Sequence, residues 1–429
     1  MRAVHLARIL VAMAWPFPLR AEAPLTLERA LAEASAHNAR LPVAEMEVAV
    51  SEQQARAARG GRLPRFSVES DFQVAPPGFG YGSGGAASIA GEERLQLVGK
   101  ETLYDGGALR AQVAAADAQI RSSLAGFRVA GKDLELEVRT RFSELVKAQD
   151  DVAAQEQALE RLQGYLATIR ARQAAGEGLE SDLLKTRVRL SGLEADLEEG
   201  RRKLQAAQLV LADLLGRDPG PPLSVAPSSV AAPLASVDGS AWQAVPELVQ
   251  LDADLAAAEA NVTVARAARR PHLDLSGDFG ILGGGLASDA PSGSLGSRLR
   301  SDMGASLTIS LSWQFLDFGI YQGQVGQAQA RAEQARRRIA LQRRDARLKW
   351  TMAVEDARRW YRQVQIREQA IPLARDAYLI AASLYRGGSG TALDVLDSFS
   401  SLLAAAQSYS DAVLSFRIAE ATALRWGTP

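Results

Sequence analysis

The sequence predicts an α+β membrane protein in which a duplicated unit of helices and strands makes up most of the chain. Three observations support this fold class: a residue pattern that recurs about halfway along the chain, helical segments with apolar residues at every seventh position, and four segments in which apolar and polar residues alternate. The helical pattern predicts long antiparallel coiled-coil hairpins. The alternation predicts four transmembrane β-strands per chain.

The duplication is visible as one constant offset between the two halves of the chain. The offset places Leu103, Asp105 and Gly107 over Phe315, Asp317 and Gly319, and then Gly176, Gly178 and Asp182 over Gly388, Gly390 and Asp394. Two copies of so large a unit predict pseudo-symmetric halves, whereas a solenoid would show shorter periods. We expect the first repeat at residues 24–216 and the second at residues 246–429.

The composition excludes several functional classes. The chain has 429 residues, a formal net charge of -1 and no cysteine. The balanced charge gives no basic surface for nucleic acid, and the lack of cysteine excludes disulfides and thiol chemistry. His5, His37 and His272 are too scattered for a histidine metal cluster. We therefore expect no metal, no cofactor and no nucleic-acid partner.

The first residues have the features of an export signal. Basic residues precede an apolar run that ends at Trp15, and residues 21–23 have the small-x-small form of a cleavage site. Residues 1–23 are therefore expected to be a signal peptide, with the cleavage point left open by Pro24. The alternative interpretation is a disordered cytoplasmic leader. No later run of apolar residues is long enough for a transmembrane helix, so a chain that crosses a bilayer would do so with strands.

Each half contains a helical hairpin with a seven-residue apolar period, expected at about 107–216 and 318–427. The first hairpin has Val138, Leu145, Val152, Leu159 and Leu166, and then Leu183, Leu190, Leu197, Leu204 and Leu211. The second has Trp350, Val364, Ile371 and Tyr378, and then Val395, Leu402, Tyr409 and Phe416. This spacing is typical of antiparallel coiled coils. An unbroken helix from Gly107 to about Ala174 would be about 100 Å long, a length that suits a protein that bridges a compartment.

The four alternating segments are expected at about 64–73, 93–104, 271–281 and 304–316. Each has one apolar and one polar face and is long enough to cross a bilayer as a tilted strand. Four strands are too few for a closed barrel, and an open edge in hydrocarbon leaves backbone groups unsatisfied. Several chains must therefore share one barrel. The proline-rich segment 217–245 is expected to be the irregular connection between the halves.

The order of these segments, written twice, resembles the TolC-like outer-membrane efflux proteins, also called outer membrane factors. The motifs that carry the resemblance are the N-terminal helix start at residues 25–31, the strand-to-helix turns at residues 103–107 and 315–319, and the hairpin turn at residues 385–397. The resemblance implies a homotrimer in the outer membrane, with a 12-stranded β-barrel continuous with an α-helical periplasmic tunnel. It also implies a periplasmic adaptor and an inner-membrane transporter as partners.

The resemblance implies roles for residues at the hairpin turns. Asp394 and Asp397 would form rings of carboxylates at the pore constriction, where like charges favour cations. The alternative for Asp394 is helix capping, because Thr391 stands three residues before it. That alternative does not explain Asp397.

Tyr385 and Asp182 match the family positions of a latch that holds the tunnel entrance shut. The family arginine of this latch is replaced by Gly390, so the strength of the closed state is open; Arg386 is a possible substitute. Ordinary coiled-coil packing is the alternative role for Tyr385. The turns that contain Gly176, Gly178, Gly388 and Gly390 lie at the far ends of the hairpins, and we expect the adaptor to dock there.

The sequence therefore favours a passive exit duct of a tripartite efflux pump or type I secretion system. The alternative is a periplasmic coiled-coil adaptor without a channel of its own, which would carry one hairpin with flanking lipoyl-like β segments. We find no Ser-His-Asp set, phosphate-binding loop or dinucleotide fingerprint and expect no enzymatic activity. Drug efflux, metal efflux and protein secretion share this architecture and are not distinguished by these residues.

Overall fold

The computed structural model describes residues 24–75, 90–218, 223–226, 240–284 and 303–427. The signal peptide expected at residues 1–23 lies outside the described residues. The same holds for most of the two loops that join paired strands and for parts of the proline-rich segment 217–245.

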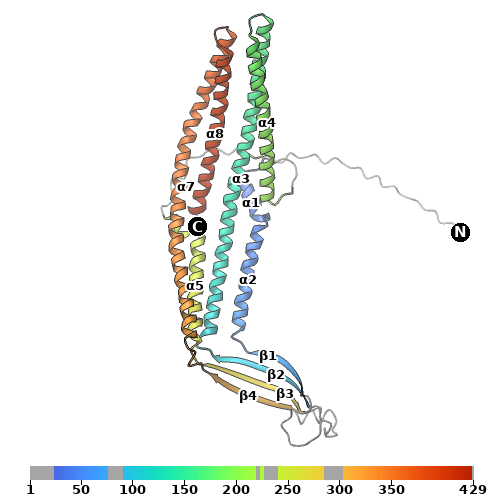
Figure 1. Cartoon of the computed structure of the whole chain (residues 1–429), viewed down its shortest axis with the longest axis vertical. Helices are drawn as coiled ribbons and strands as arrows, with labels where there is room; N and C mark the ends of the chain where they lie inside the picture. Colours follow the sequence, from blue (N-terminus) through green and yellow to red (C-terminus); the bar gives the residue numbers. More distant parts are fainter. Residues whose placement is uncertain (1–23, 76–89, 219–222, 227–239, 285–302, 428–429) are drawn as a thin grey trace, which may run out of the picture. The chain divides into compact units, whose positions relative to one another are not determined.

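Helices and strands follow the same order in the two halves of the chain (Figure 1). The first half contains α1 (Leu27–His37), α2 (Arg40–Gly60), β1 (Arg65–Ala75), β2 (Ala90–Tyr104), α3 (Ala108–Ala174) and α4 (Glu180–Leu214). The second half contains η1 (Ala241–Ala244), α5 (Pro246–Ala267), β3 (His272–Gly284), β4 (Met303–Ser312), α7 (Ile320–Arg386) and α8 (Ala392–Gly427). The long helices α3 and α7 have 67 residues each. Among the described helices, none combines the length and apolar character needed to cross a membrane.

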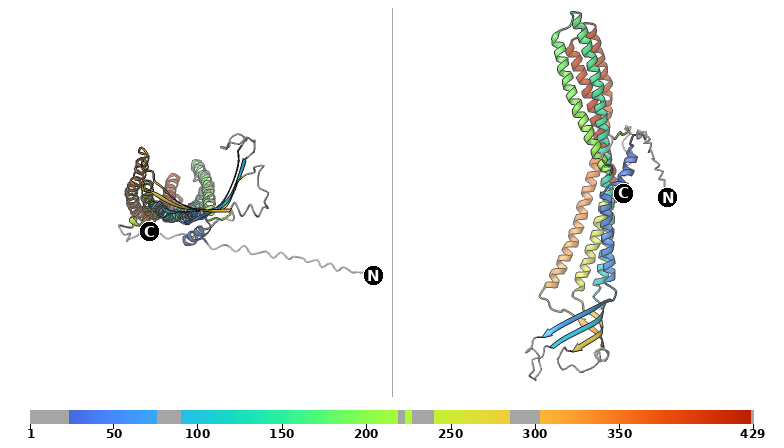
Figure 2. Two further views of the ribbon diagram at one scale, coloured as in Figure 1. Left: turned by 90° about the horizontal axis from the view of Figure 1, so that it is seen from below. Right: turned by 90° about the vertical axis from the view of Figure 1, so that its right-hand side faces the viewer.

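The four strands form one antiparallel sheet in the order β1-β2-β3-β4, and Figure 2 shows them curving side by side. The register places Val68 opposite Leu97, and Leu97 opposite Phe279. These side chains share one face of the sheet with Leu307 and Ile309, and all are exposed. The other face carries polar pairs: Thr102 with Asp274 at 2.8 Å, Ser306 with Asp278 at 2.7 Å, and Lys100 with Glu69 at 3.6 Å. The alternation in the sequence therefore becomes one apolar and one polar face.

The turns from strand to long helix are built alike in the two halves. The Asp105 carboxylate accepts a hydrogen bond from the N–H of Gly107 at 2.8 Å, and the Asp317 carboxylate accepts one from Gly319 at 3.2 Å. Gly107 and Gly319 have φ of 95° and 97°, a conformation that favours glycine. The aspartates therefore cap the helix starts, which explains why this short motif occurs in both halves.

The chain forms two compact units. Among the described residues, unit 1 contains 24–37, 138–218, 223–226 and 363–415. A group of buried apolar residues near its hairpin turns, here called the tip cluster, joins α3, α4, α7 and α8. The tip cluster consists of Ala158, Leu162, Tyr165, Ile169, Leu193, Tyr385, Ala392, Val395, Leu396 and Phe399.

Among the described residues, unit 2 contains 38–75, 90–137, 240–284, 303–362 and 416–427. Its helices form a layer in the order α2, α3, α5, α7 (Figure 1). Polar contacts join each neighbouring pair: Arg59 to Asp117 at 2.7 Å from α2 to α3, Ser122 to Asp254 at 2.5 Å from α3 to α5, and Arg336 to Glu259 at 2.7 Å from α5 to α7. The helical layer therefore has the same order as the strands to which it connects.

A buried arginine ties the end of α8 into unit 2. Arg425 is 4% exposed, and its Nε donates to Asp133 at 2.8 Å. A second guanidinium nitrogen donates to Glu247, and the guanidinium lies 4.9 Å from the ring centre of Trp426. Val245, Leu248 and Ala346 form a buried apolar group against which Trp426 packs. The charge of Arg425 is therefore compensated inside an otherwise apolar region.

Removing the Arg425 side chain should destabilise unit 2 more than removing an exposed arginine of the same unit. We expect Arg425→Ala to cost about 3–5 kcal/mol, because Glu247 would remain largely buried without its partner. The thermal unfolding midpoint, followed by circular dichroism at 222 nm, measures the effect. Arg362→Ala, at an exposed position of α7, is the matched control. Equal midpoints for the two variants would contradict the prediction.

Candidate functional site at the hairpin tips

Both helical hairpins turn at a glycine in the left-handed conformation. Gly176 has φ of 80° in the first turn, and Gly388 has φ of 78° in the second. In the first turn the N–H of Glu177 donates to the carbonyl of Arg172 at 3.0 Å, which is the long backbone bond of a Schellman motif. An L-residue with a side chain is strained at such a φ, so the glycine pair preserves the turn in both halves.

A second glycine in each turn is required by close packing. A Cβ atom at Gly178 would lie 2.8 Å from the backbone nitrogen of Gln173, and one at Gly390 would lie 2.9 Å from the backbone nitrogen of Tyr385. Any larger residue at these positions would push the turn away from the preceding helix. The arginine expected from the family at position 390 therefore does not fit this turn without a backbone shift.

Asp394 forms a capping box at the start of α8. Its carboxylate accepts hydrogen bonds from the Thr391 hydroxyl at 2.7 Å and the Thr391 N–H at 3.2 Å, and the Thr391 hydroxyl accepts from the Asp394 N–H at 3.2 Å. The bonds from Thr391 lower the pKa of Asp394 below its usual value. Because the folded-state pKa is lowered, this contribution to stability is present above the ordinary carboxyl pKa and is lost as the pH falls through the lowered value.

Asp397 lies one turn further along α8 and has a different environment. Its side chain is exposed, and among the described residues we find no hydrogen bond or ion pair to its carboxylate. Val395 and Phe399, which belong to the tip cluster, are buried. With 3.6 residues per turn, Asp394 and Asp397 therefore share the exposed side of α8, away from the tip cluster.

The first turn lacks a capping box, although the repeat supplies an aspartate at the same place. Leu179 stands where the second turn has Thr391, and it makes no side-chain cap on α4. Asp182 is the counterpart of Asp394. Burial raises the pKa of Tyr385, and the negative charge of Asp182 raises it further. Asp182 in the first hairpin therefore lies close enough for its charge to act on Tyr385 in the second hairpin.

Tyr385 packs as a core residue as well. It is 3% exposed, and its ring meets that of Tyr165 edge-on at 5.3 Å between ring centres. Tyr385 therefore has the coiled-coil packing that was the alternative role for it, and it is also acted on by the charge of Asp182.

Arg172 is the residue at this site that the sequence did not single out. Its guanidinium lies 4.9 Å from the ring centre of Tyr385 and donates to the Tyr385 carbonyl. It also lies 3.9 Å from Glu177 in its own turn. Arg172 therefore links the end of α3 to the second turn. Arg386, considered as a substitute for the missing family arginine, is exposed and donates to the Ala382 carbonyl of its own helix at 3.3 Å.

A weak signal for Arg172 was available in the sequence. Ala158, Tyr165 and Arg172 follow one another at seven-residue intervals, so a charged residue continues a buried helical stripe. The duplication could not point to it, because Leu384 stands at the equivalent place in the second half.

The family described as outer membrane efflux protein matches residues 30–217 and 239–425, one match in each half of the chain. The pyoverdine export outer membrane protein OpmQ of Pseudomonas putida is 30% identical over 260 residues, which cover 57% of this chain and 51% of OpmQ. The chain thus spans about half the length of this curated relative.

Solved structures agree in fold over nearly the whole chain. CusC aligns with a TM-score of 0.83 and 20% identity, over 94% of this chain and 92% of CusC. The CmeC outer membrane channel of Campylobacter jejuni aligns with a TM-score of 0.83 and 17% identity, over 93% of this chain and 85% of CmeC. These findings confirm the resemblance and the fold class predicted from the sequence. The chain belongs to the outer membrane efflux protein family.

Proposed function

We propose that the chain is the outer-membrane exit duct of a tripartite efflux pump or type I secretion system. The duct passively conducts substrates that an inner-membrane transporter and a periplasmic adaptor deliver to it. The observation that carries this proposal is the pairing of a four-stranded sheet, apolar on one face, with two hairpins whose long helices have 67 residues each. The matches in both halves and the four strands favour the duct over a single-hairpin adaptor.

A homotrimer satisfies the open edges of the sheet. Within the described residues, β1 pairs only with β2 and β4 pairs only with β3. In lipid, unpaired strand edges cost several kcal/mol for each backbone group, so the edges must be paired. Three copies would supply twelve strands to one closed barrel, with the apolar face toward the lipid and the helices extending into the periplasm.

The hairpin tips are proposed as the periplasmic entrance. Asp394 and Asp397 share the exposed side of α8, which supports a role for both as carboxylates at the pore constriction. The contacts of Tyr385 with Arg172, and its place within reach of the Asp182 charge, support a latch that holds the two hairpins together. The turns with Gly176, Gly178, Gly388 and Gly390 are exposed apart from the half-buried Gly178 and Gly390, and we propose them as docking points for the adaptor.

The proposed duct function can be tested by measuring the location of the protein, its oligomeric state and its conductance. The full-length protein should be recovered with outer membranes as a heat-sensitive homotrimer and should form ion channels in planar bilayers. Size-exclusion chromatography with light scattering measures the oligomer. Recovery as a soluble periplasmic monomer without conductance would contradict the proposal and favour the adaptor alternative.

The two carboxylates should contribute to selectivity in separable ways. Asp397→Asn should weaken cation selectivity and block by multivalent cations, because its exposed carboxylate is free to act on passing ions. Asp394→Asn should do the same and also loosen the start of α8, because it breaks the capping box. Single-channel recordings measure selectivity and block, and amide hydrogen exchange of residues 391–398 measures the loosening. An Asp397→Asn channel with unchanged selectivity and block would show that this carboxylate faces away from the pore.

Removing Arg172 should loosen the closed entrance without changing the charge in the permeation path. Arg172→Ala loses a charge-assisted hydrogen bond and a cation–π contact, together about 2 kcal/mol. We expect higher mean conductance with unchanged cation selectivity, and the same direction for Tyr385→Ala. Arg170→Ala, at an exposed position two residues away on α3, is the matched control. Equal conductance in the Arg172 and Arg170 variants would contradict the latch.

A further inference from the structure

An acidic residue interrupts the apolar face of the sheet. Glu101 of β2 lies opposite Leu275 of β3, and two residues further along the strands Gly99 lies opposite Gly277. Because side chains alternate between the two faces of a strand, all four positions belong to the face that carries Leu97. A carboxylate on a surface that faces lipid is costly unless a positive charge compensates it. The position of Glu101 therefore requires an explanation.

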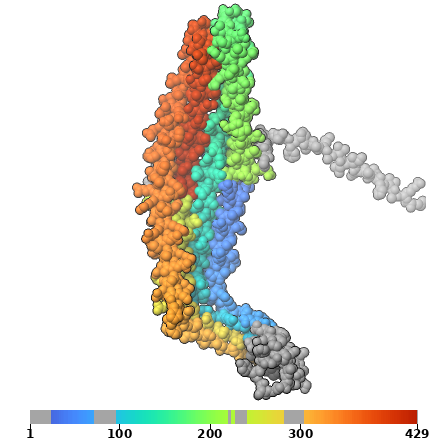
Figure 3. Space-filling model, in the orientation of Figure 1, coloured from blue at the N-terminus to red at the C-terminus, as the bar shows by residue number. Residues whose placement is uncertain are grey.

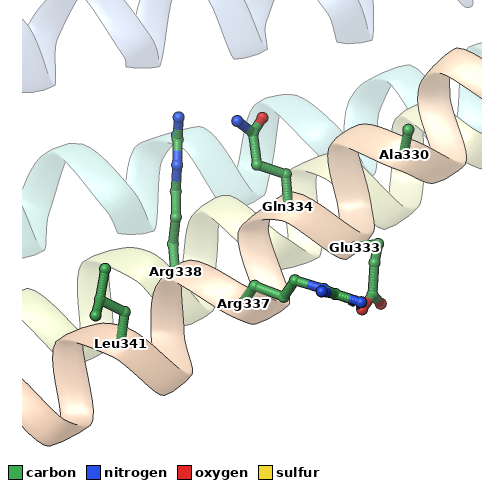
Figure 4. Close-up of a pocket in the computed structure, with 6 residues that line it drawn as sticks. All are labelled: Ala330, Glu333, Gln334, Arg337, Arg338 and Leu341. Carbon is green, nitrogen blue, oxygen red and sulfur yellow. Dashed lines mark hydrogen bonds and ion pairs between the residues drawn. The ribbon is translucent and has the colours of Figure 1, made fainter.

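Several other carboxylates of unit 2 have a basic partner within the chain. On the polar face of the sheet, Glu69 lies 3.6 Å from Lys100. On α7, Figure 4 shows the side chains of Glu333 and Arg337 meeting, at 3.0 Å. The Glu101 side chain is half-buried, and within the described part of the chain we find neither a hydrogen bond nor an ion pair to its carboxylate. Its partner must therefore come from outside the described chain.

The internal repeat places Glu101 at the level of the lipid headgroups. Glu101 precedes Asp105, which caps α3, by four residues, and Trp313 precedes Asp317, which caps α7, by the same number. Both residues therefore lie at the same distance along the strand from the start of a long helix, near the junction of sheet and helices seen in Figure 3. Trp313 is 60% exposed, and exposed tryptophans mark the membrane interface. An ammonium group of a lipid can reach Glu101 at this level.

Next to Glu101, on the side away from the helices, the apolar face has a cavity of about 390 Å³, here called the glycine pit. Gly99 and Gly277 form its floor, because two neighbouring strands lack a side chain in the same row. At about 3.3 Å per residue, this row lies about 7 Å along the strand from Glu101. The apolar side chains that surround the floor belong to Phe66, Leu97, Leu275, Phe279 and Leu307. The pit therefore extends from the headgroup level toward the hydrocarbon.

The backbone does not require glycine at the floor of the pit. Neither Gly99 nor Gly277 is among the described glycines with positive φ. A Cβ atom at Gly99 would lie 3.0 Å from the Phe66 ring, whereas one at Gly277 would lie 3.4 Å from the nearest atom of Leu307, an ordinary contact distance. A larger residue at Gly277 is thus compatible with the sheet. Its absence keeps the pit open.

We propose that Glu101 and the glycine pit bind a phospholipid whose headgroup carries a primary ammonium. The ammonium donates a charge-assisted hydrogen bond to the Glu101 carboxylate, and an acyl chain lies over Gly99 and Gly277. The negative charge of Glu101 disfavours anionic headgroups. The need for an N–H donor disfavours quaternary ammonium headgroups. The proposal rests on the outer-membrane duct of the proposed function, because it requires the apolar face of the sheet to face lipid.

Native mass spectrometry of the delipidated full-length protein tests the headgroup preference. The probes are phosphatidylethanolamine, phosphatidylcholine and phosphatidylglycerol with identical acyl chains. The wild-type protein should bind phosphatidylethanolamine about tenfold more tightly than phosphatidylcholine, because only the primary ammonium donates a hydrogen bond. Glu101→Gln should abolish this preference. Glu69→Gln, which neutralises a carboxylate on the opposite face of the sheet, is the matched control and should retain it. Equal affinities for the two lipids in the wild-type protein would overturn the proposal.

Filling the glycine pit tests the site of the acyl chain. Gly277→Leu should weaken the binding of phosphatidylethanolamine about tenfold, which corresponds to the lost burial of about two methylene groups. Gly277→Ala should weaken it less, and this smaller change provides the measurement if the leucine variant does not assemble. Ala305→Leu, at an exposed position of the same face outside the pit, is the matched control. Unchanged affinity in both Gly277 variants would show that the acyl chain lies elsewhere.

The outcomes separate the lipid site from the proposed function. Every variant should remain a heat-sensitive trimer with wild-type conductance, because none of the changes touches the helices. If the wild-type trimer conducts ions but binds the three lipids equally well, the lipid site is wrong and the duct stands. If the wild-type protein is a soluble monomer without conductance, the duct fails and the lipid site fails with it.

Discussion

The edges of the sheet are the constraint on which the rest of the structure depends. A strand edge in hydrocarbon has no water to satisfy its backbone groups, so β1 and β4 require partners that the described chain does not contain. Each strand is connected to one helix of unit 2, so the helices lie in the same order as the strands of the sheet. The outer helices α2 and α7 are therefore the ones connected to the outer strands β1 and β4.

The internal repeat divides into parts that both halves need and parts in which they differ. Both halves retain an aspartate that caps the long helix, one glycine for the left-handed turn and another for close packing. At the hairpin turns the halves have diverged. Thr391 engages Asp394 in capping, whereas Leu179 cannot engage Asp182, whose charge acts on Tyr385 instead. Asp394 and Asp182 occupy equivalent positions in the repeat. Because Thr391 is replaced by Leu179 in the first half, the two aspartates act on different residues.

The sequence predicted what depends on local pattern. The four strands, the hairpins, the turn glycines and the capping alternative for Asp394 each follow from spacing or from short-range chemistry within a few residues. It did not predict Arg172 or Arg425, because their partners are far away in the sequence. Arg172 contacts Tyr385, 213 residues later, and neither residue has a counterpart of the same type in the other half. Long-range polar contacts of this kind produce no periodic pattern in the sequence, so they are identified only from the structure.

The contact between Arg425 and Asp133 joins residues 292 positions apart, and it lies in a unit assembled from three separate stretches of chain. During synthesis, α2 and the first part of α3 emerge long before α8, so unit 2 cannot complete its interior until Arg425 has been made. Contacts of such large sequence separation are slow to form. Unit 2 therefore completes its interior only after the last helix has been made, and until then Glu247 lacks the guanidinium that compensates its charge.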